Sequence, residues 1–152
     1  MATTESLVLP EDWHLHYDYV AGPVTTRFLR GLEQGRIEGT RSPAADVVYV
    51  PPRAYCERTF EPLDEWVEVG PEGVIEGATI VVSKFEGYRD PPFALAFVRL
   101  DGADTSLVNF VEMEIGDVEE AMARLAPGAR VRAVFKDERE ARITDFAYEL
   151  VT

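Results

Sequence analysis

The sequence predicts a mainly β fold with two short helices, and three observations support this. From Trp66 onward, apolar and polar residues alternate in short runs that turn residues separate, which is typical of strands. Only residues 116–128 interrupt these runs with a helical pattern. Residues 22–35 carry apolar side chains at every fourth position, which indicates one amphipathic helix. At 152 residues, the chain suits one domain, or one domain with a small appendage.

Residues 11–20 predict a short strand or an extended arm, because large and polar residues alternate along them. Trp13, Leu15 and Tyr17 would share one face, and His14 and His16 the other. The two histidines are a candidate metal or proton site, although the sequence offers no clear third ligand nearby. The other interpretation is an arm that packs on a partner or on the barrel.

Local signals define the other elements. Pro23 suits the first position of the N-terminal helix, and Gly35 suits its end. Residues 47–50 are a short strand that Pro51 and Pro52 stop. In the second half we expect strands at residues 65–69, 73–85, 93–100, 106–114, 129–136 and 142–150.

The late helix has its own start and stop signals. Asp117 can accept hydrogen bonds from the free N–H groups of the first turn while Glu120 reaches back, and Pro127 and Gly128 close the helix. A small closed β-barrel with one helix between its late strands is typical of an OB-fold. The strand spacing alone also allows another small barrel.

Composition excludes several functional classes. The net charge of -13 repels phosphate backbones and anionic lipids, so nucleic acid and membrane are poor partners. One cysteine excludes an internal disulfide and a cysteine-only zinc site. No stretch reaches the roughly 18 apolar residues of a membrane helix, and the N-terminus lacks the features of a signal peptide. We therefore expect a cytoplasmic protein.

Residues 27–59 carry a resemblance to a known family. The helix reads RFLRGL, a GRIEG turn follows, and VYVPPR precedes the cysteine. In this order, and followed by the barrel pattern, these motifs resemble domain-of-unknown-function family 35, whose members join an N-terminal helix, a rubredoxin-like zinc ribbon and a C-terminal OB-fold barrel. The resemblance implies an N-terminal arm and helix at residues 1–35, a zinc-ribbon-like hairpin at 36–63 and an OB-fold barrel at 64–152.

The four metal-ligand positions of that family fall on Ser42, Ala45, Cys56 and Thr59, so only one cysteine remains. A structural zinc needs about four nitrogen or sulfur ligands. Ala45 has no donor atom, and hydroxyl groups are poor ligands. The sequence therefore predicts no zinc and no other cofactor, with Cys56 as a small buried apolar residue.

Without a metal the hairpin needs other support, since zinc contributes on the order of 10 kcal/mol to zinc-binding peptides. We expect Val47, Tyr49, Tyr55 and Phe60 to form a small apolar cluster. A partner surface would supply the remaining stabilisation. The hairpin is therefore a predicted docking element, with Tyr49, Arg53 and Tyr55 as its contact residues.

The predicted loop at residues 83–93 places Lys84 and Arg89 among the aromatic residues Phe85, Tyr88 and Phe93. In an OB barrel this loop links the first two strands and borders the usual binding face. The two cations are candidates for a phosphate or for the adenine end of coenzyme A. The alternative is an ordinary mobile hairpin loop with solvated charges.

The sequence shows no self-contained active site, because it lacks a G-x-S-x-G motif, a glycine-rich phosphate loop and an evident partner for the cysteine. The family resemblance implies a non-catalytic accessory subunit. It would dock on a thiolase-like, lipid-transfer-protein-like or aldolase-type enzyme as a hetero-oligomer and help to form the acyl-CoA entrance. The alternative is a stand-alone protein that binds or hydrolyses acyl-CoA thioesters.

Overall fold

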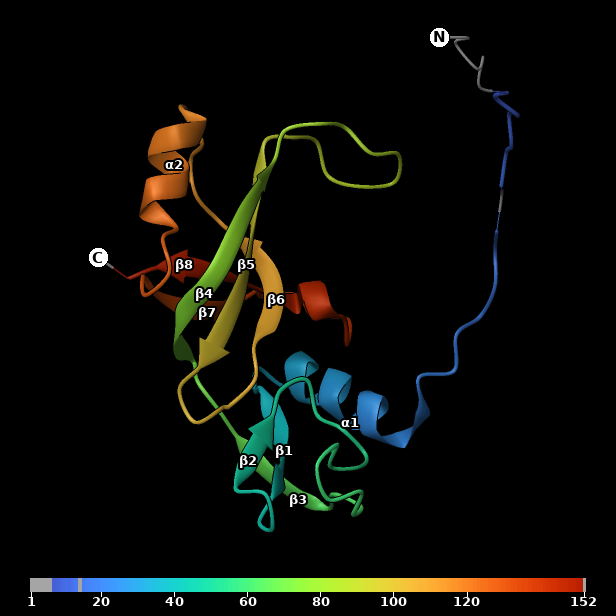
Figure 1. Cartoon of the computed structure of the whole chain (residues 1–152), viewed down its shortest axis with the longest axis vertical. Coiled ribbons are helices and arrows are strands. Elements are labelled where there is room, and N and C mark those ends of the chain that lie inside the picture. The colour runs from blue at the N-terminus through green and yellow to red at the C-terminus, as the bar shows by residue number, and fades with distance from the viewer. Residues whose placement is uncertain (1–6, 14, 152) are drawn as a thin grey trace, which may run out of the picture.

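The computed structural model describes residues 7–13 and 15–151. Figure 1 shows an extended N-terminal arm, a helix with a small three-stranded sheet, and a barrel of five strands. The mainly β fold class with an N-terminal helix is confirmed. No helix in the described part of the chain is long and apolar enough to cross a membrane.

The N-terminal helix α1 spans Gly22–Glu33, as its sequence signals predict. Proline occupies its first turn, and Phe28 and Leu32 are buried on one face. Gly35 follows the helix with φ +77°, a left-handed conformation that glycine adopts without steric cost. The described residues before α1, 7–13 and 15–21, form no strand, because no strand of the described chain pairs with them. Of the two histidines that form the predicted metal or proton site, His14 lies outside the described residues.

The three-stranded sheet has the order β2-β1-β3 and is antiparallel throughout. β1 is Glu38–Ser42, β2 is Val47–Tyr49 and β3 is Glu65–Glu68. The sequence did not predict β1. Its backbone is extended because β2 and β3 pair with both of its edges. A Cβ atom on Gly39 would lie 2.6 Å from the carbonyl oxygen of Tyr49, so glycine is required at this close approach.

Residues 65–68 were expected in the barrel, within the region 64–152, and the structure corrects this assignment. β3 pairs with β1 over the register Glu38↔Glu68 to Arg41↔Glu65. The chain passes from the small sheet to the barrel between two neighbouring residues, Val69 and Gly70. Val69 donates its backbone N–H to Ile37 beside β1, and Gly70 donates to Asp101 beside the barrel. The first barrel strand therefore starts at Glu72.

The barrel is closed in the strand order β4-β5-β6-β8-β7, with β7 paired to β4. Helix α2 (Val118–Arg124) lies between β6 and β7, and Asp117 caps it by accepting a hydrogen bond from the Glu120 backbone. This is the expected OB-fold arrangement. A short 3-10 helix, η1 (Ile143–Asp145), replaces the start of the last expected strand. The strands are β4 (Glu72–Val81), β5 (Phe93–Leu100), β6 (Leu107–Val111), β7 (Arg130–Phe135) and β8 (Phe146–Leu150).

The barrel closes at a short contact between β6 and β8, which share one parallel pair, Val111↔Tyr148. The buried side chain of Asn109 supports this seam. Its Nδ2 donates to the carbonyl oxygens of Ile143 and Phe146, both at 2.9 Å, and its Oδ1 accepts from the Phe110 backbone. Asn109 therefore replaces part of the missing backbone ladder.

One hydrophobic core joins the helix, the small sheet and the barrel. Phe28 and Leu32 of α1, and Val50 directly after β2, pack in the same cluster as Val98 and other residues of the barrel interior. Ala54 and Leu63 are joined by a backbone hydrogen bond that closes the loop after β2. The N-terminal helix and the barrel consequently form one packed body.

Candidate functional site

The tip of the small sheet contains the predicted metal-ligand positions, and hydrogen bonds order the chain around them. The Cys56 backbone carbonyl accepts from the Phe60 N–H at 2.8 Å, and the Cys56 N–H donates to Glu61 at 2.9 Å. Thr40 accepts from the Arg53 N–H at 2.8 Å and donates to the Arg53 carbonyl at 3.0 Å. These bonds hold the two loops together through the protein chain itself.

The apolar cluster at this tip differs from the expected one. Cys56 is fully buried, as predicted, beside Val47, Tyr49 and Leu63. Tyr55 and Phe60 are 64% and 82% exposed, so their predicted place in the cluster is wrong. Sequence reasoning missed Leu63. Its N–H bonds back to Ala54, and this turns its side chain inward.

The residues at the former ligand positions do not fit a zinc ion. The Ala45 side chain is a methyl group, and its backbone N–H donates to the Ser42 hydroxyl at 3.3 Å. The Thr59 hydroxyl oxygen is buried without a hydrogen-bond partner. Within residues 7–13 and 15–151, no three histidine, cysteine or acidic side chains are grouped as a metal site requires. The zinc-free state stays a prediction for direct metal analysis.

Cys56 lies among three hydroxyl groups. Those of Ser42, Thr59 and Tyr49 lower the pKa of the Cys56 thiol to about 6, although burial acts in the opposite direction. Only the Tyr49 hydroxyl lies at hydrogen-bonding geometry, 3.4 Å from Sγ. Because the side chain has no exposed surface, a substrate cannot reach the sulfur, and Cys56 has a structural role.

The predicted docking residues of the hairpin lie in different environments. Tyr49 is only 1% exposed and faces Cys56, so its predicted contact with a partner is wrong. The Arg53 guanidinium covers the Tyr49 ring, 4.7 Å from its centroid, and pairs with Glu57. Arg53 remains half exposed and Tyr55 is exposed, so docking through these two residues stays a prediction.

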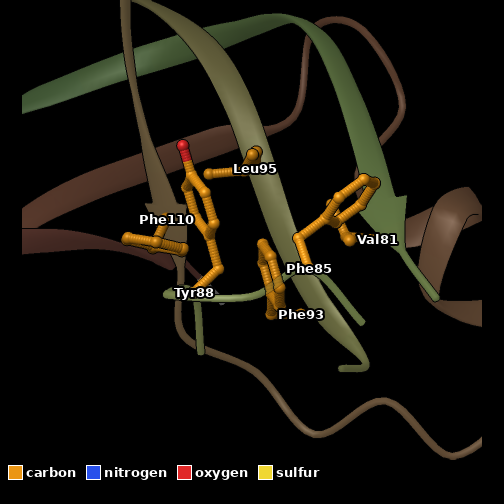
Figure 2. Close-up of a pocket in the computed structure, with 6 residues that line it drawn as sticks. All are labelled: Val81, Phe85, Tyr88, Phe93, Leu95 and Phe110. Atoms are coloured by element: carbon orange, nitrogen blue, oxygen red, sulfur yellow. The ribbon is translucent and has the colours of Figure 1, made fainter. Parts of the chain in front are cut away.

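A second candidate site is an apolar pocket at one end of the barrel, with a volume of about 380 Å³. Figure 2 shows side chains from the end of β4, the following loop, β5 and β6 converging on it. Phe93 and Phe110 meet edge to face, with ring centroids 5.6 Å apart. Phe85 and Tyr88 come from the loop and are largely exposed. The lining residues are Val81, Phe85, Tyr88, Phe93, Leu95 and Phe110.

Arg89 lies at the edge of this pocket. Its guanidinium carbon is 5.0 Å from the Phe110 ring centroid and 5.8 Å from that of Phe93. The same guanidinium donates to both carboxylate oxygens of Glu112, at 2.9 and 3.4 Å. An arginine held in this position combines an apolar pocket with a positive charge at its rim.

Lys84 lies on the same loop and pairs with Asp90 at 2.7 Å, with both side chains largely exposed. Sequence reasoning placed both cations, Phe85 and Tyr88 correctly in one loop between the first two barrel strands, whereas Phe93 is the first residue of β5. It missed Phe110, Leu95 and the partner Glu112. Phe110 lies on β6 and Glu112 directly follows it, and the pairing of β6 with β5 brings both residues to the loop.

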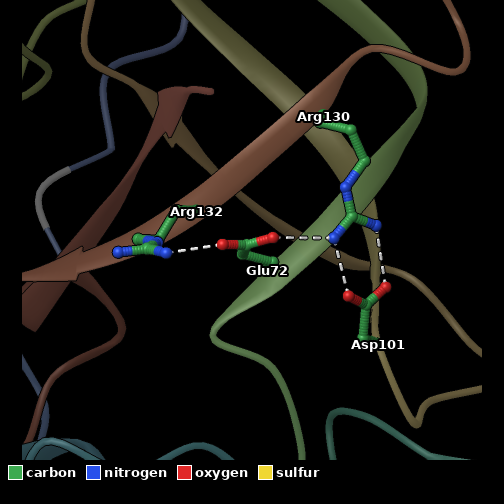
Figure 3. A network of polar contacts seen from close by, with 4 residues as sticks. All are labelled: Glu72, Asp101, Arg130 and Arg132. Carbon is green, nitrogen blue, oxygen red and sulfur yellow. Dashed lines mark hydrogen bonds and ion pairs between the residues drawn. The ribbon is translucent and has the colours of Figure 1, made fainter. Parts of the chain in front are cut away.

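A network of charged side chains lies on the barrel wall (Figure 3). Arg130 donates to both Asp101 carboxylate oxygens, at 2.9 and 2.7 Å, and to Glu72 at 3.0 Å. Arg132 also donates to Glu72. These arginines hold the pKa of Glu72 and of Asp101 below their ordinary values, so both carboxylates stay ionised. The network joins β4, β7 and the turn after β5, which is a structural role.

Comparison with known proteins identifies the barrel. Residues 66–136 match the family model described as ChsH2, C-terminal OB-fold domain. This segment is similar to the ChsH2-type OB-fold domain. The resemblance inferred from the sequence is thereby confirmed. None of the curated proteins matches the chain.

Two solved structures are similar over most of the chain. One is a DUF35-family protein of unknown function from Sulfolobus solfataricus, with 22% identity and a TM-score of 0.64, covering 86% of this chain and 87% of that one. The other is named Ltp2-ChsH2(DUF35) aldolase, with 17% identity and a TM-score of 0.61, covering 83% of this chain and 91% of that one. Both similarities extend beyond the ChsH2-type domain and show the same fold.

Proposed function

We propose that this chain is an accessory subunit that docks on a thiolase-like or aldolase-type enzyme and forms part of its acyl-CoA entrance. The observation that carries the proposal is the ChsH2-type barrel joined to a helix and ribbon. The structure named Ltp2-ChsH2(DUF35) aldolase aligns with 83% of this chain, which is more than the barrel alone. The combination of modules, and not the barrel alone, supports a shared role.

The chemistry of the described residues supports catalysis by the partner. Cys56 is buried, and the strongest carboxylate cluster, Glu72 with Asp101, is neutralised by two arginines. A nucleophile or general base must reach the substrate and change its protonation state during the reaction. Neither group meets both conditions, so the reacting residues belong to the other subunit.

The barrel pocket is suited to one part of an acyl-CoA. Its walls are aromatic and aliphatic, which favours an acyl chain or another apolar group. Arg89 and Lys84 can each exchange an exposed carboxylate for a phosphate, since exposed ion pairs contribute only about 0–1 kcal/mol and charge-assisted phosphate contacts are stronger. A pocket of 380 Å³ holds only a fragment of this ligand, and the partner surface would complete the site.

The first test is purification of the tagged full chain from its native host, followed by identification of bound proteins. We expect a thiolase-like or aldolase-type enzyme in fixed stoichiometry, with carbon–carbon bond turnover by the complex. A chain that elutes alone, from cells that contain such enzymes, would refute the proposal.

The second test addresses the pocket within the purified complex. Phe85→Ala with Tyr88→Ala removes two exposed side chains and should raise KM for acyl-CoA about thirtyfold, since each of the two lost apolar contacts weakens binding by roughly 1 kcal/mol. Phe97→Ala is the matched control, because Phe97 is exposed on β5 outside the pocket. An unchanged KM in the double variant would exclude the pocket from the entrance.

The alternative function is a stand-alone protein that binds or hydrolyses acyl-CoA. One observation favours it, because the pocket is already formed in the single chain. Calorimetry with an acyl-CoA and a free-thiol assay on the isolated protein distinguish the two functions. We expect no hydrolysis and weak binding, and turnover by the isolated chain would favour the alternative.

A further inference from the structure

The N-terminal arm, residues 7–13 and 15–20, has no role in the proposed pocket. Figure 1 shows it running away from the body of the protein, from the start of α1. Its large apolar side chains are 68% to 88% exposed. They are Leu7, Val8, Leu9, Trp13, Leu15, Tyr17, Tyr19 and Val20. Soluble monomers rarely keep so many large apolar side chains together in water, so this concentration points to a binding segment.

The order of residues in the arm suits binding in an extended conformation. In an extended chain, alternate side chains point the same way at about 3.3 Å per residue. Trp13, Leu15, Tyr17 and Tyr19 would then form one apolar row about 20 Å long. Aromatic side chains supply a large contact area and lose few rotatable bonds on binding. The row therefore has the composition of an interface centre.

The charge of the arm indicates what it binds. Residues 7–20 contain Glu11, Asp12 and Asp18 and no lysine or arginine. The whole chain carries a net charge of -13, so a second copy, or the surface of its own barrel, repels the arm. The complementary surface is an apolar groove bordered by lysine or arginine on a different protein.

We propose that the arm is a docking strap that binds an apolar, cation-bordered groove on the partner enzyme. This inference rests on the proposed accessory function and assigns the arm a separate contact on the same partner. The strap is attached to α1, which Phe28 and Leu32 anchor in the core. Once the ribbon and barrel dock, the arm is held near the partner, and its binding raises the total affinity through effective concentration.

The test uses the full-length chain with Trp13→Ser, Tyr17→Ser and Tyr19→Ser together. Trp13 is 73% exposed and donates a hydrogen bond to Glu11 within the arm, at 3.0 Å, so the variant should melt at the same temperature as the wild type. Affinity for the purified partner enzyme should fall at least about thirtyfold, as expected when interface-centre aromatics are truncated. Phe97→Ser, an exposed aromatic change on β5, is the control and should stay within about twofold.

A second variant tests the charge complementarity. Glu11→Gln with Asp18→Asn should slow association at low salt and reduce its salt dependence, because both carboxylates would face cations of the groove. If the association rates of this variant and of the wild type depend equally on salt concentration, the groove on the partner is not bordered by cations.

The outcomes separate this inference from the proposed function. Wild-type binding with equal binding by the triple variant would refute the strap and leave the accessory function intact. Absence of wild-type binding to any thiolase-like enzyme would refute both. A dimer of this chain that the triple variant abolishes would also overturn the proposal, since the groove would then lie on a second copy.

Discussion

Asn109 is the residue whose replacement should reveal how the barrel is closed. Its side chain makes three hydrogen bonds, two to the carbonyls of Ile143 and Phe146 and one from the Phe110 backbone. Asn109 is only 4% exposed, so water cannot easily replace these bonds. At about 1 kcal/mol for each net hydrogen bond, Asn109→Ala should lower the free energy of unfolding by about 3 kcal/mol.

Urea unfolding followed by far-ultraviolet circular dichroism measures this loss, with equal m values required for the comparison. Ser106→Ala, which removes a surface hydroxyl bonded to Glu76, is the control and should cost less than about 1 kcal/mol. Asn109→Asp keeps the shape of the side chain, but its ionised form has no donor for the two carbonyls. It should be at least as destabilising at neutral pH and recover partly in acid, where the protonated carboxyl can donate one bond. A loss below about 1 kcal/mol for Asn109→Ala would refute the assigned role.

Four further predictions concern the ribbon, the pocket rim and the barrel wall. Metal analysis of the purified protein should find no zinc, and a chelator should leave its Tm unchanged; bound stoichiometric zinc would contradict the ligand argument. The pKa of Cys56 is about 6 in the folded state, and its ordinary value is 9, so ionisation of the thiol stabilises the folded state. This stability is fully present above about pH 9 and is lost as the pH falls through 6, so thiolate absorbance should titrate near 6 and Cys56→Ala should flatten the pH dependence of stability. Arg89→Ala should weaken acyl-CoA binding by the complex several-fold, while Glu112→Gln frees the guanidinium and should not weaken it; the reverse order would exclude a phosphate role. Arg130→Ala should lower Tm more at low than at high ionic strength, because it breaks an exposed charge network, and an equal effect at both would contradict this.

Local signals in the sequence were sufficient for much of the fold. Proline near the start and glycine after the end of α1 fixed that helix, and the Asp117 cap fixed α2. The barrel strands were recognisable because runs rich in β-forming residues are separated by turn residues at short intervals. β1 was not recognisable, because its sequence, EGTRS, has no β-forming pattern and is extended only through pairing on both edges.

The candidate sites were predictable only in part. Lys84 and Arg89 could be placed in one loop because they are close in sequence. The carboxylate partner of Arg89 could not be assigned, since the pairing of β5 with β6 brings Glu112 to it. The inward orientation of Tyr49 was missed for a similar reason. It depends on the register with Thr40 and on the hydrogen bond to Cys56, both of which are tertiary features.

The shared core of α1, the small sheet and the barrel has a thermodynamic consequence. A ribbon held by a metal can lose its order when the metal is removed, independently of a neighbouring domain. Here Phe28, Leu32 and Val50 connect the ribbon side of the molecule to the barrel interior. Loss of either part exposes the same apolar surface, so heating should give one cooperative transition with equal calorimetric and van't Hoff enthalpies. Folding of the small sheet is in this sense coupled to folding of the barrel.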